Sequence, residues 1–303
     1  MALQIGTRVS TELQNRMLFI RMLEERLQEL CDEGKAGDLH FSKGQEAISV
    51  GVCAALKETD YVVTHHRTIA HAIAKGVPLR PLLGEIMGKA EGLNGGMAGE
   101  MHLSDLARRF MFSFQLVGTC VSVAAGVAWA VKNHLKTDDV VVVFHGDAVT
   151  SNGQWHEGLN IAAVQKLPLL LVCENNHLAG NVRPEHYQPV EFVSDRAKAY
   201  GIPGWRADGN DIEEVTLLAT TALLYIREFG GPVLIEYDTT RLGRHKQGMG
   251  DLRTQEEKTL LALRDPLRDV AFDPDLRRSY EAEIEAVLEA LENSPDPVLS
   301  QEA

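Results

Sequence analysis

The sequence predicts an α/β fold, a parallel β-sheet flanked by helices on both faces with a helical C-terminal arm. Four short runs are rich in aliphatic and β-branched residues and lack alternation with polar residues. These runs are "DYVVT", "DDVVVVFH", "LPLLLVCE" and "GPVLIEYDTTR". Such strands are typical of sheets buried on both faces. Because they alternate with helical patterns, they should be joined by right-handed crossovers into a parallel sheet.

The helices are predicted from their apolar periodicity and end signals. In the first, apolar residues recur at helical spacing from Leu13 to Leu30, and the two glycines of "EGKAGD" end it. Further helices are expected over residues 44–58, 119–136, 152–166 and 211–229. From about residue 251 the sequence becomes charged and helical in pattern. We therefore predict an α/β domain over residues 1–250 and a helical arm over residues 251–303.

Composition excludes several classes of partner. The chain has 303 residues and a formal net charge of -13 with no basic run, so neither nucleic acid nor an anionic membrane surface is an expected partner. No segment has the apolar length of a membrane span, and the N-terminus lacks a signal-peptide pattern, which predicts a cytoplasmic protein. Four widely spaced cysteines in apolar patterns are expected to be reduced core thiols: Cys31, Cys53, Cys120 and Cys173.

Polar residues follow each predicted strand and should meet at one rim of the sheet, where parallel sheets bind ligands. They are Thr64 to Arg67, Gly146-Asp147, Glu174 to Asn176, and Arg241 to His245. Asp147 and Asn176 offer hard oxygen ligands, which suit magnesium or calcium better than zinc. Arg67 and the nearby histidines could neutralise phosphate. Alone, however, Gly146-Asp147 is also compatible with a helix start, and the paired histidines with a solvated turn.

Six ordered blocks of sequence resemble one enzyme family. They are "HFSKGQEAISVG", "THHRTIAHAIAKG", "GLNGGMAGEMHLSD", "LVGTCVSVAAGVA", "NGQWHEGLNIAAVQKLPLLLVCENN" and "TTRLGRHKQGMGDLRTQEE". In these blocks the chain is similar to the α subunits of thiamine diphosphate-dependent 2-oxo acid dehydrogenases, the pyruvate and acetoin dehydrogenase group. The family's Gly-Asp-Gly and Asn-Asn signature is present as "GDA" and "ENN", with Asp147 and Asn176 twenty-nine residues apart.

The resemblance implies roles for individual residues. Asp147, Asn176 and the carbonyl of Leu178 would hold magnesium on the cofactor diphosphate. Cofactor contacts would come from His66, Arg67, Leu116, Val117, Gly146, Asp147, Ala148, Asn176 and His245. His40 and His245 would be catalytic, near the reacting centre, where histidines can donate to an oxyanion and transfer protons. On its own pattern, His40 could equally be a helix-capping or core residue.

The implied reaction is decarboxylation of a 2-oxo acid or cleavage of an acyloin, with transfer of the acyl or aldehyde unit to an acceptor such as a lipoyl group. Several positions depart from the family pattern, and two of them, Glu100 and Gly243, leave the substrate and the acceptor open. Ala148 replaces a glycine, which is harmless only at negative φ. Glu100 stands where a small residue or serine is usual, and Gly243 where a histidine is frequent. Lys246 replaces the phosphorylatable serine of regulated relatives.

The resemblance also implies a partner. A β subunit would supply the pyrimidine-binding domain and the catalytic glutamate, in a heterotetramer, and a lipoyl acceptor would require a lipoyl-bearing acyltransferase. Two alternatives remain: the N-terminal half of a split transketolase, suggested by "SKG" at 42–44, and a non-catalytic structural subunit. A nicotinamide-dependent dehydrogenase is disfavoured because no GxGxxG motif follows a strand.

Overall fold

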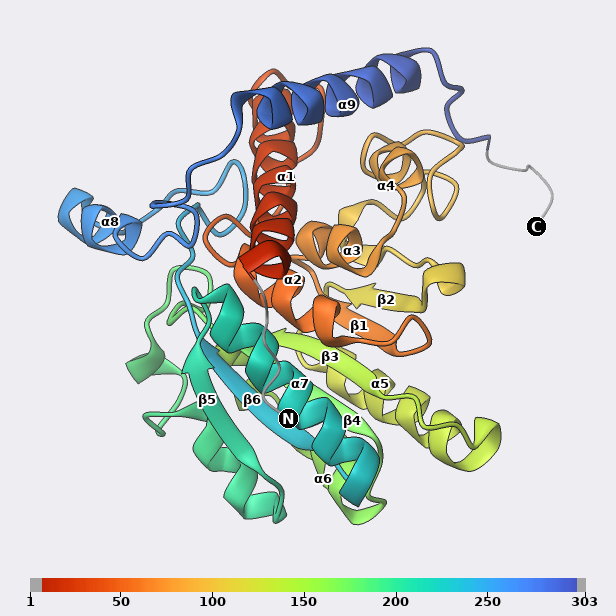
Figure 1. Ribbon diagram of the computed structural model, residues 1–303, viewed down its shortest axis with the longest axis vertical. Helices are drawn as coiled ribbons and strands as arrows, with labels where there is room; N and C mark the ends of the chain where they lie inside the picture. Colours follow the sequence, from red (N-terminus) through yellow and green to blue (C-terminus); the bar gives the residue numbers. More distant parts are fainter. Residues whose placement is uncertain (1–6, 299–303) are drawn as a thin grey trace.

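The computed structural model of the chain, which describes residues 7–298, contains a six-stranded parallel sheet in the order β2-β1-β3-β4-β6-β5 (Figure 1). Its strands are β1 (Tyr61–His65), β2 (Phe110–Phe114), β3 (Val141–Gly146), β4 (Leu169–Asn175), β5 (Gly204–Asp208) and β6 (Val233–Asp238). The α/β fold expected from the sequence is confirmed.

The helices expected from apolar periodicity are present as α1 (Thr7–Asp32), α2 (Glu46–Ala55), α5 (Thr119–Ala130), α6 (Gly153–Val164) and α7 (Ile212–Phe229). The structure adds the shorter α3 (Ile69–Lys75) and α4 (Leu79–Ile86), which periodicity did not predict, and places α8 (Gln255–Ala262) and α9 (Pro274–Glu292) in the C-terminal segment. Asn152 and Asp211 cap α6 and α7, each accepting backbone N–H bonds of the first turn.

Each face of the sheet has its own apolar core, since successive strand residues point to opposite faces. Val142 of β3 belongs to the core shared with α1, α2, α3, α4 and α7. Its neighbour Val143 belongs to the core shared with α5 and α6. The central strands are therefore buried on both sides, which explains their uninterrupted apolar sequence.

The two edge strands are the ones that the sequence does not reveal. The four runs recognised as strands correspond to β1, β3, β4 and β6, which are adjacent in the sheet. By contrast, β5 ("GWRAD") buries only Ala207, and β2 ("FMFSF") buries only Phe110 and Ser113. Because an edge strand is covered less completely, it loses the continuous apolar signal of a buried parallel strand.

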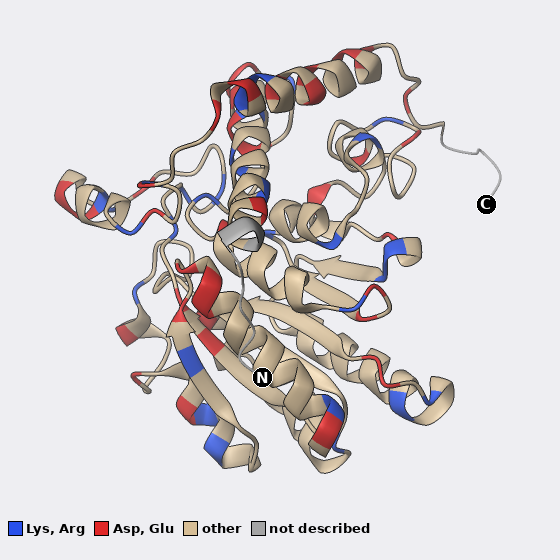
Figure 2. Cartoon of the chain, viewed as in Figure 1, with Lys and Arg blue, Asp and Glu red and all other residues tan. Residues whose placement is uncertain are grey.

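The C-terminal segment packs against the N-terminal helices. In Figure 1, α9 lies across the end of α1 and above α4. Arg26 of α1 bonds to Glu285 of α9, and Arg21 of α1 bonds to both Glu46 and Asp265. Figure 2 shows acidic residues spaced along α9. The helices of the expected arm are present, while the domain boundary near residue 250 stays a prediction.

Within residues 7–298, no helix combines the length and the apolar content that a bilayer crossing requires. The four cysteines are free thiols, and Cys120 and Cys173 are buried.

Candidate functional site

A cavity of about 620 Å³ lies beyond the carboxyl ends of the central strands. All the site residues predicted from the sequence line its wall: His40, His66, Arg67, Leu116, Val117, Gly146, Asp147, Ala148, Asn176, Leu178 and His245. They come from six separate stretches of the chain. The parallel sheet brings them together because its strands all end at the same rim.

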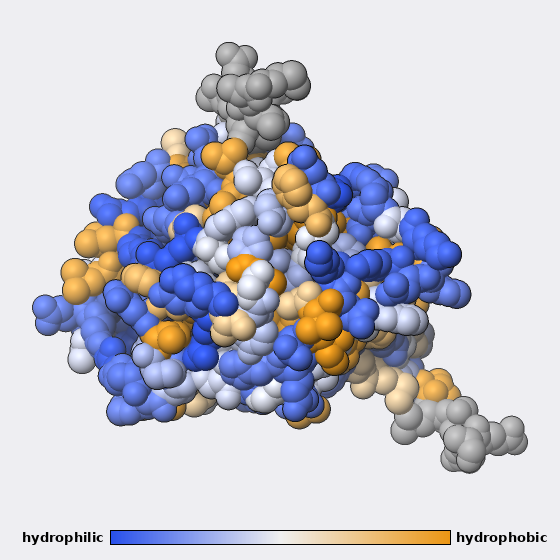
Figure 3. Space-filling view, turned by 90° about the horizontal axis from the view of Figure 1, so that it is seen from below, coloured by the Kyte–Doolittle hydropathy of each residue, from blue (hydrophilic) through white to orange (hydrophobic). Residues whose placement is uncertain are grey.

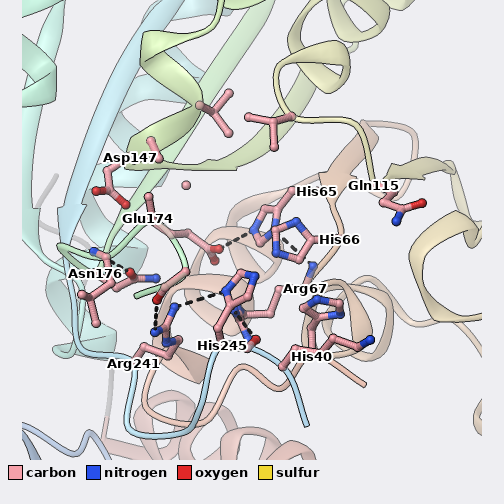
Figure 4. Close-up of a pocket in the computed structure, with 18 of the residues that line it drawn as sticks. His40, His65, His66, Arg67, Gln115, Asp147, Glu174, Asn176, Arg241 and His245 are labelled. Carbon is pink, nitrogen blue, oxygen red and sulfur yellow. Dashed lines mark hydrogen bonds and ion pairs between the residues drawn. The ribbon is translucent and has the colours of Figure 1, made fainter. Parts of the chain in front are cut away.

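One end of the cavity carries oxygen donors. Asp147 follows β3 and Asn176 follows β4, and Figure 4 shows both side chains on the same side of the cavity. His177 has a left-handed backbone with φ of 58°, and this turn places the backbone of Leu178 beside Asn176, whose Oδ1 accepts the Leu178 N–H at 3.2 Å. A carboxylate, an amide and a backbone carbonyl on one side of the cavity form a donor set that suits magnesium.

Ala148 is accommodated without strain. It lies in the 3-10 helix η4 (Asp147–Ser151), where φ is negative, and it is absent from the positive-φ residues of the described chain. The Cβ that replaces the family's glycine hydrogen therefore costs nothing in backbone conformation. This departure from the family signature is compatible with the same loop path.

Tyr187 is a neighbour of Asp147 that the sequence did not indicate. Its hydroxyl donates a hydrogen bond to Asp147 Oδ2, and its own carbonyl accepts from Ser151. Asp147 is only 1% exposed, and this burial raises the pKa of its carboxyl. A bound divalent cation would reverse that effect by stabilising the charged form.

Two arginines also line the cavity, and Figure 4 shows Arg241 on the same side as Asn176. The Arg67 guanidinium donates to the carbonyls of Phe41 and His245, at 2.5 and 3.0 Å. Arg241 donates to the carbonyl of Gly180, and its buried Nε has no partner among the described residues. Because a buried donor without a partner is costly, the Arg241 Nε fits a site that receives an anion.

Three histidines form a cluster at the other end of the cavity. His40, His66 and His245 each place one ring nitrogen within 4.8 Å of the others. Burial and the nearby Arg67 lower the pKa of His40 to about 4 and the pKa of His245 to about 3. Burial and the neighbouring His65 also lower the pKa of His66. Neutral imidazoles can each donate one hydrogen bond and accept another.

His40 is paired with a carboxylate. Its Nδ1 lies 2.6 Å from Glu100 Oε1, and the same oxygen accepts the His40 backbone N–H at 2.8 Å. Both residues are buried. The departure from the family pattern at Glu100 therefore adds a carboxyl group that contacts the predicted catalytic residue His40. The sequence marked it as unusual but gave no indication that it contacts His40, sixty positions away.

The loop that carries Glu100 is organised by a second buried glutamate. The carboxylate of Glu85, in α4, accepts four backbone N–H groups of the following loop, from Asn94, Gly96, Ala98 and Gly99. Gly96, at φ of 73°, could not carry a side chain, since a Cβ would lie 2.3 Å from the carbonyl of Lys89. Glu85 therefore fixes the entry into the short helix η1 (Glu100–His102).

A third buried carboxylate joins two histidines beneath the cavity. Glu174, at the end of β4, bonds to His65 Nε2 at 2.7 Å and to His71 Nε2 at 2.9 Å. The backbone N–H of Arg67 donates to His65 Nδ1, and the carbonyl of Arg67 faces His71 Nδ1. Two histidines anchored on one carboxylate thus hold the backbone of Arg67 on both sides. Sequence reasoning placed Glu174 and His65 at the rim but missed His71.

The loop after β6 is held by Arg253. Its guanidinium donates to the backbone carbonyls of Arg241, Leu242 and Gly243. Lys246 in the same loop pairs with Asp38 at 3.3 Å. The residue that replaces the relatives' serine is therefore engaged in an ion pair that closes the loop over the cavity.

Comparison with known proteins decides the family. The profile of the dehydrogenase E1 component family matches residues 14–270. The chain belongs to this family. It is 39% identical to the α subunit of acetoin:2,6-dichlorophenolindophenol oxidoreductase of Bacillus subtilis, over 81% of this chain and 73% of that protein. It is 32% identical to the pyruvate dehydrogenase E1 component α subunit of Porphyra purpurea, over 95% of this chain and 90% of that protein.

Membership of the E1 family confirms the enzyme class expected from the sequence, a thiamine diphosphate-dependent dehydrogenase α subunit. A further relative, from Cupriavidus necator, is again an acetoin:2,6-dichlorophenolindophenol oxidoreductase α subunit, 35% identical over 82% of this chain and 74% of that protein. The relatives thus include both acetoin and pyruvate enzymes. They favour the dehydrogenase group over the transketolase and nicotinamide alternatives.

Proposed function

We propose that this E1 chain binds thiamine diphosphate through magnesium and, with a β subunit, decarboxylates a 2-oxo acid or cleaves an acyloin. The acyl or aldehyde unit then passes to an acceptor such as a lipoyl group on an acyltransferase. The observation that supports this most directly is the cavity itself, which joins an oxygen-donor end to a cationic and histidine-rich end.

The residues present fit the cofactor's two charged components. Asp147, Asn176 and the carbonyl of Leu178 would hold magnesium, which takes hard oxygen ligands and phosphate oxygens together. Arg67 and the unpartnered Nε of Arg241 would face the diphosphate. When bound, thiamine diphosphate supplies a carbon nucleophile and accepts the electron pair of the bond that breaks. The chain itself binds it, excludes water and moves protons, for which His40 and His245 are the candidates.

The pyrimidine end of the cofactor requires another chain. Leu116 and Val117, which would present their backbone to the ring, are 72% and 50% exposed. Among the described residues that line the cavity, Glu174 is the only glutamate, and it is bonded to two histidines. The glutamate that activates the aminopyrimidine therefore belongs to the β subunit in this proposal.

Exposed apolar side chains are consistent with such a partner. Trp129 on α5 and Ile161 and Val164 on α6 are at least half exposed. On the face seen from below, apolar residues gather in several groups between hydrophilic ones (Figure 3). Stable interfaces bury surfaces of this kind.

The chain alone is expected to be inactive. It should be purified with and without the product of its neighbouring gene, then assayed on 2-oxo acids and acyloins with 2,6-dichlorophenolindophenol as electron acceptor. Activity should require both chains, thiamine diphosphate and magnesium. Full activity of the isolated chain would refute the two-chain proposal. If calorimetry detects no cofactor binding even in the complex, the chain is a structural subunit instead.

His245→Ala should lower kcat/KM by roughly ten-fold or more without unfolding the protein. His245 lies in a loop, and its Nδ1 is 3.4 Å from the guanidinium nitrogens of both Arg67 and Arg241, so its loss affects the site rather than the core. The free energy of unfolding should change by no more than about 0.5 kcal/mol, as at other loop positions. His134→Ala, at an exposed position outside the cavity, is the control. Equal kinetics in both variants would make His245 a structural residue.

A further inference from the structure

We propose that Glu100 and His40 form a carboxylate–histidine pair that removes the hydroxyl proton of an α-hydroxy ketone, so that the natural substrate is an acyloin and not a 2-oxo acid. This inference rests on the proposed function and specifies its substrate. It makes His40 the catalytic base and Glu100 the residue that positions it. The inference is based on the contact between these two side chains at the edge of the cavity.

The pair has the geometry of an oriented base. Glu100 Oε1 already accepts the backbone N–H of His40, so the carboxylate oxygen is fixed relative to the peptide that carries the ring. With Nδ1 donating to that oxygen at 2.6 Å, the unprotonated nitrogen is Nε2. An ionised carboxylate held in this way fixes the tautomer and the orientation of an imidazole, with Nε2 free to accept a proton. The four N–H bonds to Glu85 hold the loop that delivers Glu100.

The ring is placed to reach a ligand. His40 lines the cavity and meets His66 and His245 edge to face, with ring centroids 4.7 and 5.4 Å away. Figure 4 shows His40, His66 and His245 together at the end of the cavity away from Asp147. If Asp147 marks the metal and diphosphate, the His40 pair lies toward the part of the cavity left for substrate.

The two reactions differ in their need for such a base. Thiamine diphosphate, when bound, would accept the electron pair of the bond that breaks in either substrate. In a 2-oxo acid that bond joins the carbonyl and carboxylate carbons, and carbon dioxide would leave without loss of a hydroxyl proton. In an acyloin it joins the carbonyl and carbinol carbons, the electron pair of the carbinol O–H bond would form the C=O of the released aldehyde, and the hydroxyl proton must go to a base. His40 Nε2 is the acceptor in this scheme.

The charges at the site point in the same direction. Lys246 already pairs with Asp38, and Arg67 and the unpartnered Nε of Arg241 would serve the diphosphate in the proposed function. Once ionised, Glu100 adds a negative charge at the histidine cluster, which disfavours a second carboxylate there. A neutral ketone avoids this repulsion, and its carbon chain can contact the cavity residue Met101.

The pair should give the reaction a pH dependence. The titratable groups that face Glu100 are the neutral His40 imidazole and the cations of Arg67 and Lys246, with the Cys31 thiol of α1 nearby. Burial raises the pKa of Glu100 to about 8, against the opposing influence of the His40 N–H, Arg67 and Lys246. Raising the pH through this value ionises Glu100 and leaves His40 Nε2 basic. The rate on an acyloin should therefore rise with pH through an apparent pKa near 8.

The test uses the α/β complex with acetoin and pyruvate as alternative substrates. We expect the wild type to prefer acetoin, and Glu100→Gln to lower kcat on acetoin by about 10- to 100-fold with KM within about three-fold, as for loss of general-base assistance. The rise with pH should disappear in Glu100→Gln. Glu100→Ser should shift the ratio of kcat/KM values toward pyruvate. Glu58→Gln, at an exposed position outside the cavity, is the control.

A second readout does not depend on turnover. In the cofactor-free complex, proton NMR should show a strongly downfield Nδ1–H resonance that is lost in both Glu100→Gln and His40→Asn, and its absence in the wild type would contradict the pairing. Preference for pyruvate, or an equal loss on both substrates in Glu100→Gln, would overturn the inference alone, provided calorimetry shows thiamine diphosphate binding. A complex that binds no cofactor would overturn the proposed function and this inference together.

Discussion

Asp147→Ala should abolish turnover, by about three orders of magnitude or more, because it removes the carboxylate that would bind magnesium at the oxygen-donor end of the cavity. Without that anion, Asn176 and the Leu178 carbonyl are neutral ligands, and magnesium binds weakly to such a set. The loss of metal removes the charge that offsets the diphosphate. Asn176→Ala should have a smaller effect that excess magnesium partly restores, since the carboxylate remains.

Calorimetric titration of magnesium and thiamine diphosphate into the α/β complex measures this directly. The Asp147→Ala complex should bind the pair at least 100-fold more weakly, a difference of about 2.7 kcal/mol. Asp138→Ala is a suitable control, since Asp138 is exposed and pairs with Lys57 at the surface. Normal metal and cofactor affinity in Asp147→Ala would contradict the assignment of this end of the cavity.

The central part of the fold could be predicted because a strand that is buried on both faces has a recognisable apolar sequence. A strand with helices on both faces has apolar residues at successive positions, as in β3 and β4, whose registered residues are almost all buried. The edge strands β2 and β5 have a neighbour on one side only and carry mixed sequences. Their pairing is set by tertiary packing, which local periodicity does not encode.

The same contrast applies to the site. Asp147, Asn176 and Arg67 could be placed together because each follows a strand, and parallel strands end at a common rim. Glu100 and His71 lie away from strand ends, on the short helix η1 and on α3. Their partners, His40 and Glu174, are 60 and 103 positions distant. Hydrogen bonds at such separations depend on loop paths, so sequence pattern alone could mark Glu100 as unusual without revealing its role.

Glu174→Ala should destabilise the protein strongly, by about 3–5 kcal/mol, the range observed when one member of a buried ion pair is removed. His71 Nδ1 faces the carbonyl of Arg67 while its Nε2 faces Glu174, so both nitrogens must donate and the ring is an imidazolium paired with a carboxylate. Truncation would leave that charge buried and His65 without its acceptor. It would also release both bonds that hold the backbone of Arg67, so affinity for thiamine diphosphate should fall as well.

Glu174→Gln separates the charge from the hydrogen bonds. The amide oxygen can accept from His65, and the amide nitrogen can donate to a neutral His71, so the framework around Arg67 survives. We expect a loss of about 1 kcal/mol or less near neutral pH. Urea unfolding of both variants beside the wild type provides the measurement. If Glu174→Gln were as unstable as Glu174→Ala, the charge of the Glu174–His71 pair would stabilise the fold, and the hydrogen bonds alone would not be enough.

The two variants should also differ in their response to acid. Burial alone would raise the pKa of the Glu174 carboxyl, but the charge of His71 and the hydrogen bonds from both histidines hold it below the ordinary value of 4.5. A carboxyl with a depressed folded pKa contributes stability above its unfolded pKa and loses that contribution as the pH falls. Wild-type stability should therefore decline below about pH 4.5. In Glu174→Gln the buried His71 is neutral while the unfolded histidine takes up a proton, so that variant should begin to lose stability at a higher pH, below about 6.5. Parallel declines would mean that Glu174 is already protonated in the folded protein, and the carboxylate between the two histidines would then have to be redrawn as a neutral acid.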